Sequence, residues 1–323
     1  MRACYRIMEA ARPIDHPCLS RQSFEGFGHW WQLGGRPQQA WLASDDRGEP
    51  VGFYQLVLPD RDNVRAAFGG LFVSPARRRA GIGTAMLAHC REQARQAGRV
   101  LIASTDLTRT KVRDGSPGGY FAAAVGARTG LAELISIQDV TQDLPGRLAG
   151  LRAAAWRSAA GYELVSWRGP SPAEYLQQVA QVGAAMSDAP RDAGREPDTW
   201  DADRIAASDQ AAAARGLHLY SVAARRPGAA EFAAITQLNV DSGTPESASQ
   251  GITVVRPEDR GHRLGLLVKI AMLDLVMPHE PRLRRILTGN AESNVHMTRI
   301  NAELGYKVSA VYRSWQLDLA DSP

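Results

Sequence analysis

Short apolar runs separated by turn residues dominate the first third of the chain. Runs of this kind, bounded by Gly, Pro and Asp, are typical of β-strands. The polar stretch Asp45–Gly48 predicts a hairpin turn between the first two runs. Four strands are predicted here, near Gln39–Ser44, Val51–Leu58, Ala66–Val73 and Val100–Ser104.

A helical pattern follows the third strand. Apolar residues recur there every four positions, which is the spacing of a helix that buries one face, at Ile82, Met86, Cys90 and Ala94. The second half of the chain shows the same succession of patterns. Its predicted elements are a helix at Tyr175–Met186, strands near Leu217–Ala223, Glu231–Val240 and Gly251–Arg256, a helix that presents Leu264, Leu267, Val268, Ala271 and Leu275 on one side, a strand near Arg285–Thr288 and a helix at Ala291–Leu304.

The two halves resemble copies of one unit. Leu71–Cys90 combines an apolar run, a Pro-containing turn, an Arg/Gly-rich loop and an amphipathic helix, and Thr253–Leu273 repeats this order. Gly83 recurs as Gly265, at an offset of 182 residues. Three landmarks in the same order at a nearly constant offset indicate an internal repeat. The other two landmarks are Val51–Leu58 with Glu231–Leu238, at an offset of 180, and Gly126 with Gly305, at an offset of 179.

The repeat predicts two α/β domains in tandem, at residues 1–170 and 171–323. The Pro/Gly/Ser cluster Gly169–Pro172 is the expected boundary. The segment Gly161–Trp167 could close the first sheet or open the second. For the polar strip Asp188–Asp201, a surface loop and a lid over a cleft are both open interpretations.

The composition narrows the class of protein. The 323 residues are 44% hydrophobic and 22% charged, which excludes a wholly disordered chain. The chain has no apolar run of membrane-helix length and no signal-peptide pattern at its beginning, so we expect a cytoplasmic protein without a membrane partner. A net charge of +4 without a basic stripe argues against nucleic-acid binding. The three cysteines are widely spaced and predict neither disulfides nor a metal site.

The loop after the third strand has the chemistry of an anion site. A strand that leads into Arg-x-x-Gly-x-Gly and a helix directs backbone N–H groups and the positive end of the helix to one place. Arg78, Gly81, Gly83 and Thr84 would suit a pyrophosphate there. The alternative is a plain strand-to-helix turn. No Gly-Lys-Ser/Thr follows, so the loop is not a P-loop.

These residues resemble the pyrophosphate loop of the GNAT N-acetyltransferase superfamily, Gln/Arg-x-x-Gly-x-Gly/Ala. Arg78–Gly83 fits this pattern fully, and Arg260–Gly265 fits except that Arg263 replaces a glycine. The resemblance implies two GNAT-like domains of α/β (α+β) class, each with a mixed, mostly antiparallel sheet flanked by helices. It also implies acetyl-CoA, or another acyl-CoA, as co-substrate.

A second GNAT signature, Asn-x-x-Ala-x-x-Leu-Tyr-x-x-x-Gly-Phe/Tyr, matches the end of the chain in part. Asn294 and the pair Gly305-Tyr306 are kept, whereas Asn301 occupies the tyrosine position. In the family this asparagine helps to hold the pantetheine arm and the tyrosine often protonates the departing thiolate. In the first copy Gly115 and Ala122 occupy the two positions, so the signature is nearly absent.

The carboxylate that often serves as base in this family is missing from its usual strand. Gly69-Gly70 and Gly251-Ile252 occupy the expected positions. We therefore take Glu231 and Asp241, which flank the preceding strand of the second copy, as candidate bases, each of which could instead be a solvated charge at a strand end. The predicted catalytic residues are Glu231, Asp241, Asn301 and Tyr306. Tyr120 and His296 are weaker candidates, and Phe27, Trp30 and Trp31 could roof the first cleft or form a core cluster.

The predicted cofactor-binding residues lie on the strand ends, loops and helix starts of both copies. They are Phe72, Val73, Arg78, Arg79, Ala80, Gly81, Ile82, Gly83, Thr84, Val254, Val255, Arg260, Gly261, His262, Arg263, Gly265 and Asn294.

The favoured hypothesis is an acyl-CoA-dependent N-acyltransferase that acts on the primary amine of a small molecule by direct attack on the thioester. The second half would be catalytic and the first a CoA-binding or structural partner, with the reverse assignment open. The alternative is a non-catalytic acyl-CoA-binding or regulatory module. Residues 1–170 carry 22 Lys/Arg and 15 Asp/Glu, against 16 and 19 in residues 171–323, which suits phosphates in the first half and a cationic amine in the second. We expect a monomer or a homodimer.

Overall fold

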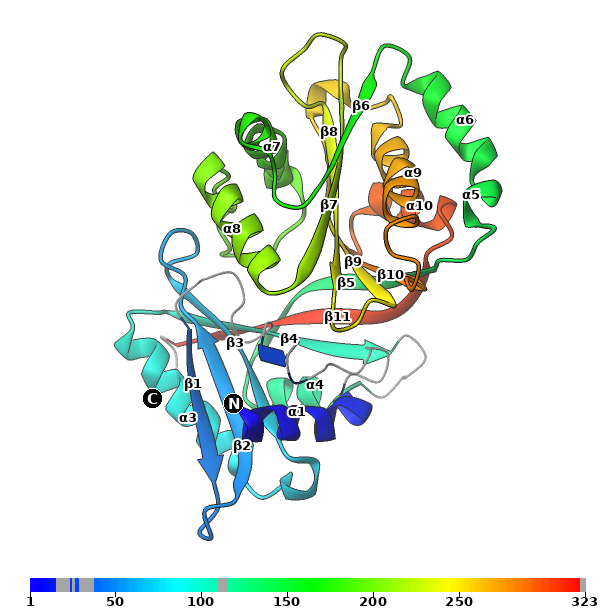
Figure 1. The fold of residues 1–323 in the computed structure, drawn as a ribbon. Coiled ribbons are helices and arrows are strands. Elements are labelled where there is room, and N and C mark those ends of the chain that lie inside the picture. The colour runs from blue at the N-terminus through cyan, green and yellow to red at the C-terminus, as the bar shows by residue number, and fades with distance from the viewer. Residues whose placement is uncertain (16–23, 25–26, 29–37, 110–114, 320–323) are drawn as a thin grey trace. The chain divides into compact units, whose positions relative to one another are not determined.

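The computed structural model describes residues 1–15, 24, 27–28, 38–109 and 115–319 (Figure 1). The chain forms two compact units. The first unit contains Met1–Leu134, Arg191–Glu196 and Ser309–Pro323, and the second contains Ile135–Pro190 and Pro197–Val308. Each unit is therefore built from segments that are separated in the sequence.

The first unit is a sheet with helices on both faces. Its strand order is β1-β2-β3-β4-β11-β5. β3 and β4 are parallel, whereas β1 with β2, β2 with β3 and β4 with β11 are antiparallel. The elements are α1 (Arg2–Asp15), β1 (Gln38–Ser44), β2 (Pro50–Val57), β3 (Ala66–Val73), α3 (Ile82–Gln96), β4 (Leu101–Arg109), α4 (Pro117–Ala124), β5 (Arg128–Asp139) up to Leu134, and β11 (Lys307–Asp318) from Ser309.

The sequence explains the local shape of this unit. Asp45 Oδ1 accepts hydrogen bonds of 3.0 Å from the backbone N–H groups of Arg47 and Glu49, which closes the predicted hairpin turn. α3 buries Met86, Cys90 and its neighbouring apolar residues against β2 and β3, as the four-residue spacing predicts. A second cluster joins α1 to the sheet, and its members are Cys4, Ile7, Met8, Phe27 and Phe53.

The second unit repeats this plan with the strand order β5-β10-β9-β8-β7-β6. β9 and β10 are parallel, whereas β6, β7, β8 and β9 pair antiparallel in succession. Its elements are α5 (Leu144–Arg147), α6 (Ala149–Ser158), β6 (Glu163–Arg168), α7 (Leu176–Gly183), α8 (Ala202–Ala214), β7 (Leu217–Arg225), β8 (Ala234–Asp241), β9 (Ser247–Val255), α9 (Leu264–Val276), β10 (Arg285–Ala291), α10 (Val295–Glu303) and the end of β5 from Ile135.

The expected fold class is confirmed, whereas several boundaries differ. β4 extends to Arg109, beyond the predicted end at Ser104. Ala291 ends β10, so the last helix begins only at Val295. The register pairs Gly52 with Val73 and Ala234 with Val255. Residues of β2 and β8 therefore correspond at an offset of 182 residues, as the two loops do, whereas the predicted offset for these strands was 180.

β11 and β5 were not predicted from the sequence. β11 is the last strand of the chain, yet most of it lies in the first unit, beside β4. β5 passes from the first unit to the second. In the part of the chain that the structure describes, no helix is both long and apolar enough to cross a membrane.

Candidate active site

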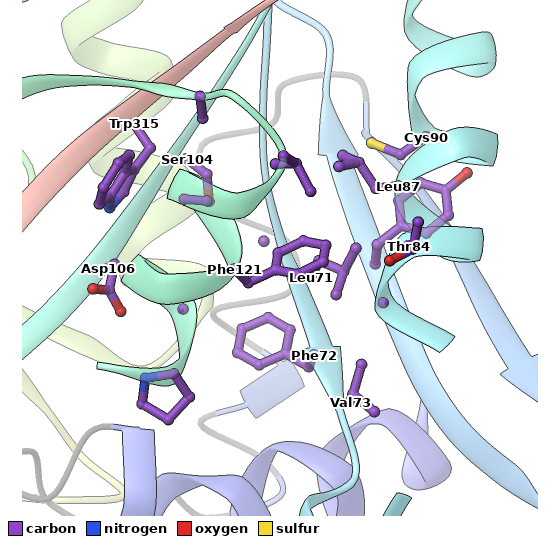
Figure 2. A pocket seen from close by; sticks show the side chains of 18 of the residues that line it. Leu71, Phe72, Val73, Thr84, Leu87, Cys90, Ser104, Asp106, Phe121 and Trp315 are labelled. Carbon is purple, nitrogen blue, oxygen red and sulfur yellow. The ribbon is translucent and has the colours of Figure 1, made fainter. Parts of the chain in front are cut away.

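A cavity opens in the first unit where two parallel strands separate. β3 and β4 are paired only at Ala66–Phe68 and Leu101–Ala103. Beyond this ladder lies a cavity of about 820 Å³, whose walls come from β3, β4, β11, α3, α4 and the loop before α3 (Figure 2). Peptide groups on the free edge of a strand can pair with an extended ligand that contains amides.

The loop before α3 forms one end of this cavity. Gly81 adopts φ +78°, so the chain can turn into α3 with no side chain at the mouth. The N-terminus of α3 has the partial positive charge that attracts phosphates. Of the predicted cofactor-binding residues, these line the cavity: Phe72, Val73, Arg78, Arg79, Gly81, Ile82, Gly83 and Thr84.

The arginines of the loop have different roles. Arg78 donates two hydrogen bonds to the carboxylate of Asp15, at 2.9 and 2.6 Å, and one from Nε to the carbonyl of Val73, at 3.2 Å. Arg77 is paired with Asp45 at 2.8 Å. Arg79 is exposed and lines the cavity. Arg78 thus holds the loop against α1. Arg79, which is exposed at the cavity, is therefore the better candidate of these arginines for binding a phosphate.

Two glycines keep the walls of the cavity close together. A Cβ on Gly83 would lie 3.3 Å from the ring of Phe121, where α3 and α4 approach each other. A Cβ on Gly69 would lie 1.9 Å from the carbonyl oxygen of Gln55, where β2 and β3 meet. A larger residue at Gly69 would force the two strands apart, and a larger residue at Gly83 would displace the ring of Phe121.

Two carboxylates, Asp15 and Asp106, are among the described residues that line this cavity, and the sequence analysis identified neither. Asp15 is bonded to Arg78, so Asp106 is the better candidate for chemistry. It lies on the part of β4 beyond the predicted strand end, and it accepts a hydrogen bond from Ser116 Oγ at the start of α4. Burial raises the pKa of Asp106 above the ordinary aspartate value, and the nearby charge of Asp15 raises it further, although the Ser116 hydrogen bond opposes both. A carboxylate of raised pKa in a cavity is a candidate general base.

The corresponding space in the second unit contains polar side chains of the protein itself. Lys269 Nζ donates to Asn301 Oδ1 at 2.7 Å, and Asn301 Nδ2 donates to Asn290 Oδ1 at 2.5 Å. Lys269 Nζ also lies 4.8 Å from the centre of the Tyr306 ring. The repeat matches Lys269 and Asn301 to Leu87 and Ala122, which line the cavity of the first unit.

The loop of the second unit is held by its own salt bridges and hydrogen bonds. Arg260 pairs with Asp188 at 2.8 Å, and Arg263 pairs with Glu303. His262 Nδ1 lies 3.3 Å from the carbonyl oxygen of Ser158. The other predicted binding residues of this unit are Val254, buried in β9, Val255, which packs against the core, and Gly261 and Gly265 in the loop and the first turn of α9.

The predicted catalytic residues of the second unit are not gathered in one place. Glu231 is exposed before β8, and Asp241 ends that strand, where its Oδ1 accepts a hydrogen bond of 2.8 Å from the backbone of Gly243. The length of β8 separates them by roughly 25 Å. Asn301 and Tyr306 are close together but buried, and burial raises the pKa of Tyr306.

Asn294 is the N-cap of α10. Its Oδ1 accepts a hydrogen bond of 3.2 Å from the backbone N–H of Met297, which is the ordinary task of such a residue. His296 is exposed on the same helix. Tyr120 is 58% exposed on α4 and lines the cavity of the first unit, whereas Ala80 is exposed in the loop but does not line it.

The polar strip Asp188–Asp201 contains a segment that packs into the first unit. Buried Asp192 accepts hydrogen bonds from the backbone N–H of Leu131 and, at 2.6 Å, from Ser314 Oγ. The segment therefore connects β5 with β11. Phe27 is buried in the α1 cluster, whereas Trp30 and Trp31 lie outside the described residues.

Each half contains two parallel strands that pair only over a short ladder, together with a glycine loop and a helix that follow the first of them. This arrangement defines the class of fold. Residues 1–113 match the model of the acetyltransferase (GNAT) family. A solved tandem GNAT protein from the clavulanic acid biosynthesis pathway is 27% identical to the chain, with a TM-score of 0.77 and coverage of 100% of this chain and 95% of that one.

Two further solved structures share the fold. A GCN5-related N-acetyltransferase from Sphaerobacter thermophilus is 14% identical with a TM-score of 0.70, over 98% of this chain and 92% of that one. A glucosamine N-acetyltransferase region of a fungal multi-domain β-N-acetylglucosaminidase is 16% identical with a TM-score of 0.65, over 97% of this chain and 36% of that one. No curated protein matches the chain.

Residues 1–113 are therefore of the acetyltransferase (GNAT) family, and the chain as a whole has the fold of a tandem GNAT protein, which indicates an N-acetyltransferase of the GNAT type. Proteins of this family generally use acetyl-CoA as co-substrate.

Proposed function

We propose that the chain transfers an acyl group from an acyl-CoA, most simply acetyl-CoA, to the primary amine of a small molecule, and that the first unit carries out the reaction. The observation that supports this proposal is the cavity of about 820 Å³ that joins the glycine loop at the start of α3 to the carboxylate of Asp106. A volume of this size is in the range of small-molecule sites.

The residues of this cavity suit a coenzyme A thioester. The N-terminus of α3 and Arg79 would bind its phosphates. The edge of β3 beyond Phe68, which is not paired with β4, would bond the amides of the pantetheine arm. When bound, the thioester supplies an electrophilic carbonyl carbon and a thiolate leaving group. Asp15 and Asp45 pair with Arg78 and Arg77, so these contacts orient the loop before any ligand arrives.

Asp106 would accept the proton of the attacking amine. An amine attacks only when it is neutral, so a base near the carbonyl carbon accelerates the reaction. Asp106 lies on β4, across the opening from β3. Its raised pKa makes it a stronger base than an exposed aspartate.

Contacts in the second unit support placing the reaction in the first unit. Lys269 and Asn301, which are hydrogen-bonded to each other, occupy positions whose counterparts in the first unit, Leu87 and Ala122, line the cavity. Asn301 is also bonded to Asn290. A pantetheine arm in the second unit would have to displace these buried hydrogen bonds at a cost in free energy. The base proposed here is therefore Asp106 and not Glu231 or Asp241.

The deciding experiment compares matched glycine variants. Acetyl-CoA binding is measured by calorimetry and thiol release is followed with a panel of primary amines, for the wild type, Gly83→Glu and Gly265→Glu. We expect Gly83→Glu to abolish both binding and turnover, and Gly265→Glu to retain both. The opposite result would move the reaction to the second unit. Binding without thiol release from any amine would favour the non-catalytic acyl-CoA-binding module.

A further inference from the structure

Trp315, on the last strand of the chain, lines the cavity of the first unit. In the register of β11 and β4, Trp315 lies opposite Ser104, and Arg313 lies opposite Asp106. Residues directly opposite or two apart on neighbouring strands share one face of a sheet. Figure 2 accordingly shows Trp315, Ser104 and Asp106 on one side of the cavity and Leu87 and Cys90 on the other.

The indole N–H of Trp315 is buried and finds no acceptor among the residues that the structure describes. An indole Nε1–H can only donate. The carboxylate of Asp106, on the same wall, accepts a hydrogen bond from Ser116. A buried donor without a partner costs free energy, and native structures rarely keep one unless water or a ligand satisfies it.

The surroundings of the indole favour a neutral oxygen as its partner. Many residues that line the cavity are apolar, Leu71, Phe121 and Leu317 among them, and the wall of Trp315 also carries the carboxylate of Asp106. An isolated charged group would lose its hydration there. The pantetheine arm of an acyl-CoA contains two amide carbonyls and one thioester carbonyl, all of which are neutral acceptors.

We propose that Trp315 Nε1–H donates a hydrogen bond to a carbonyl oxygen of the acyl-pantetheine arm, so that the chain's last strand completes the co-substrate site of the first unit. This inference rests on the proposed function, because it requires the acyl-CoA to bind in this cavity. It implies that residues 1–170 alone lack one wall of their own binding site.

The test follows the indole N–H directly. In protein labelled with ¹⁵N-tryptophan, the Trp315 signal is assigned as the one missing from Trp315→Phe. We expect this signal to shift downfield on addition of coenzyme A if an amide carbonyl is the acceptor, or only on addition of acetyl-CoA if the thioester carbonyl is. Trp315→Phe should weaken acetyl-CoA binding by about three- to tenfold.

Trp167 provides the matched control. Its Nε1 is also buried without a partner among the described residues, but it belongs to the core of the second unit and does not line the cavity. Trp167→Phe should leave acetyl-CoA affinity unchanged, and its signal should not move. If calorimetry shows acetyl-CoA binding while the Trp315 signal stays fixed, this inference fails and the proposed function stands. If acetyl-CoA does not bind the wild type at all, the proposed function fails as well.

Discussion

Lys269 donates a hydrogen bond of 2.7 Å to Asn301 inside the second unit, at positions where the first unit has Leu87 and Ala122. The lysine side chain is 3% exposed, and no carboxylate neutralises it in the described contacts of its amine, which are with Asn301 and the ring of Tyr306. The two units therefore differ at two matched positions. Leu87 and Ala122 line an open cavity in the first unit, whereas Lys269 and Asn301 place hydrogen-bonded polar side chains in the interior of the second.

Lys269 makes stability depend on pH. Burial lowers the pKa of Lys269 to about 7, whereas a lysine in an unfolded chain titrates near 10.4, so the folded state holds fewer protons between about pH 7 and about pH 10. The free energy of unfolding therefore rises with pH in this window, by up to about 1.4 kcal/mol per pH unit. Lys269→Met lacks this contribution.

Urea unfolding of the wild type and Lys269→Met between about pH 7 and about pH 9.5 measures the difference. The wild type should gain stability relative to the variant as the pH rises. Parallel pH profiles would show that Lys269 keeps the same pKa in the folded and unfolded states. Lys307, which is exposed at the start of β11, offers a control in Lys307→Met, whose profile should match the wild type.

Leu87→Lys transfers the lysine of the second unit to the cavity of the first. Ala122 offers no counterpart to Asn301, so the new ammonium would have to reach solvent through the space that we assign to pantetheine. We expect acetyl-CoA binding to be lost and the fold to be kept. Calorimetry with the conservative variant Leu87→Met as control tests this, and normal affinity in Leu87→Lys would place the pantetheine arm elsewhere.

Asp106→Asn tests the proposed base through a pH profile. Below its pKa the carboxyl group is protonated and cannot accept the proton of the amine, so kcat/KM should fall as the pH falls through that value. Because burial raises the pKa of Asp106, this acidic limb should lie above the pH at which an ordinary aspartate titrates. Asp106→Asn should lose the limb and about two to four orders of magnitude in kcat. A variant that keeps both would assign the base to another group or to solvent.

The loop before α3 was easier to predict from the sequence than Asp106, the base that we propose. The pattern Arg78–Gly83 depends on backbone turns and on a helix start, which are local properties and are therefore visible in the sequence. Asp106 was missed because the stretch Thr105–Arg109 is mostly polar and resembles a loop. It is a strand because β11, far away in the sequence, pairs with it. Such long-range pairing leaves no local pattern.

The catalytic prediction favoured the second half because it carries the fuller family signature. Asn294 and the pair Gly305-Tyr306 fit that signature, yet a signature does not show whether a side chain is free to meet a ligand. Asn294 caps a helix and Tyr306 is 8% exposed. The apolar residues Val311, Trp315 and Leu317 fall on alternate positions and could have indicated the last strand. This pattern does not show that the strand lies in the first unit.

Asp192→Ala tests whether the segment Arg191–Glu196 stabilises the first unit. Asp192 is 8% exposed, and its carboxylate bonds both the backbone of Leu131 and the hydroxyl of Ser314. Hydrogen bonds to a charged group contribute about 1.5–3 kcal/mol, so we expect a loss of about that size in the free energy of unfolding. Asp188→Ala, which removes an exposed ion pair with Arg260, should cost less than about 1 kcal/mol. Equal effects would contradict the packing of this segment.

Asn294→Ala separates two roles that the sequence left open. As the N-cap of α10, Asn294 satisfies the backbone N–H of Met297, and its loss should lower the free energy of unfolding by about 1 kcal/mol. If the first unit carries out the reaction, kcat/KM per folded molecule should not change. Ser116 has the same capping role on α4, where it accepts a hydrogen bond from Gly119 at 3.0 Å, but it also bonds Asp106. Ser116→Ala should therefore lower both stability and kcat/KM. Urea unfolding and steady-state kinetics, measured on the same two variants, distinguish these roles. A fall of about tenfold in kcat/KM for Asn294→Ala, in a protein that remains folded, would indicate that the pantetheine arm binds in the second unit.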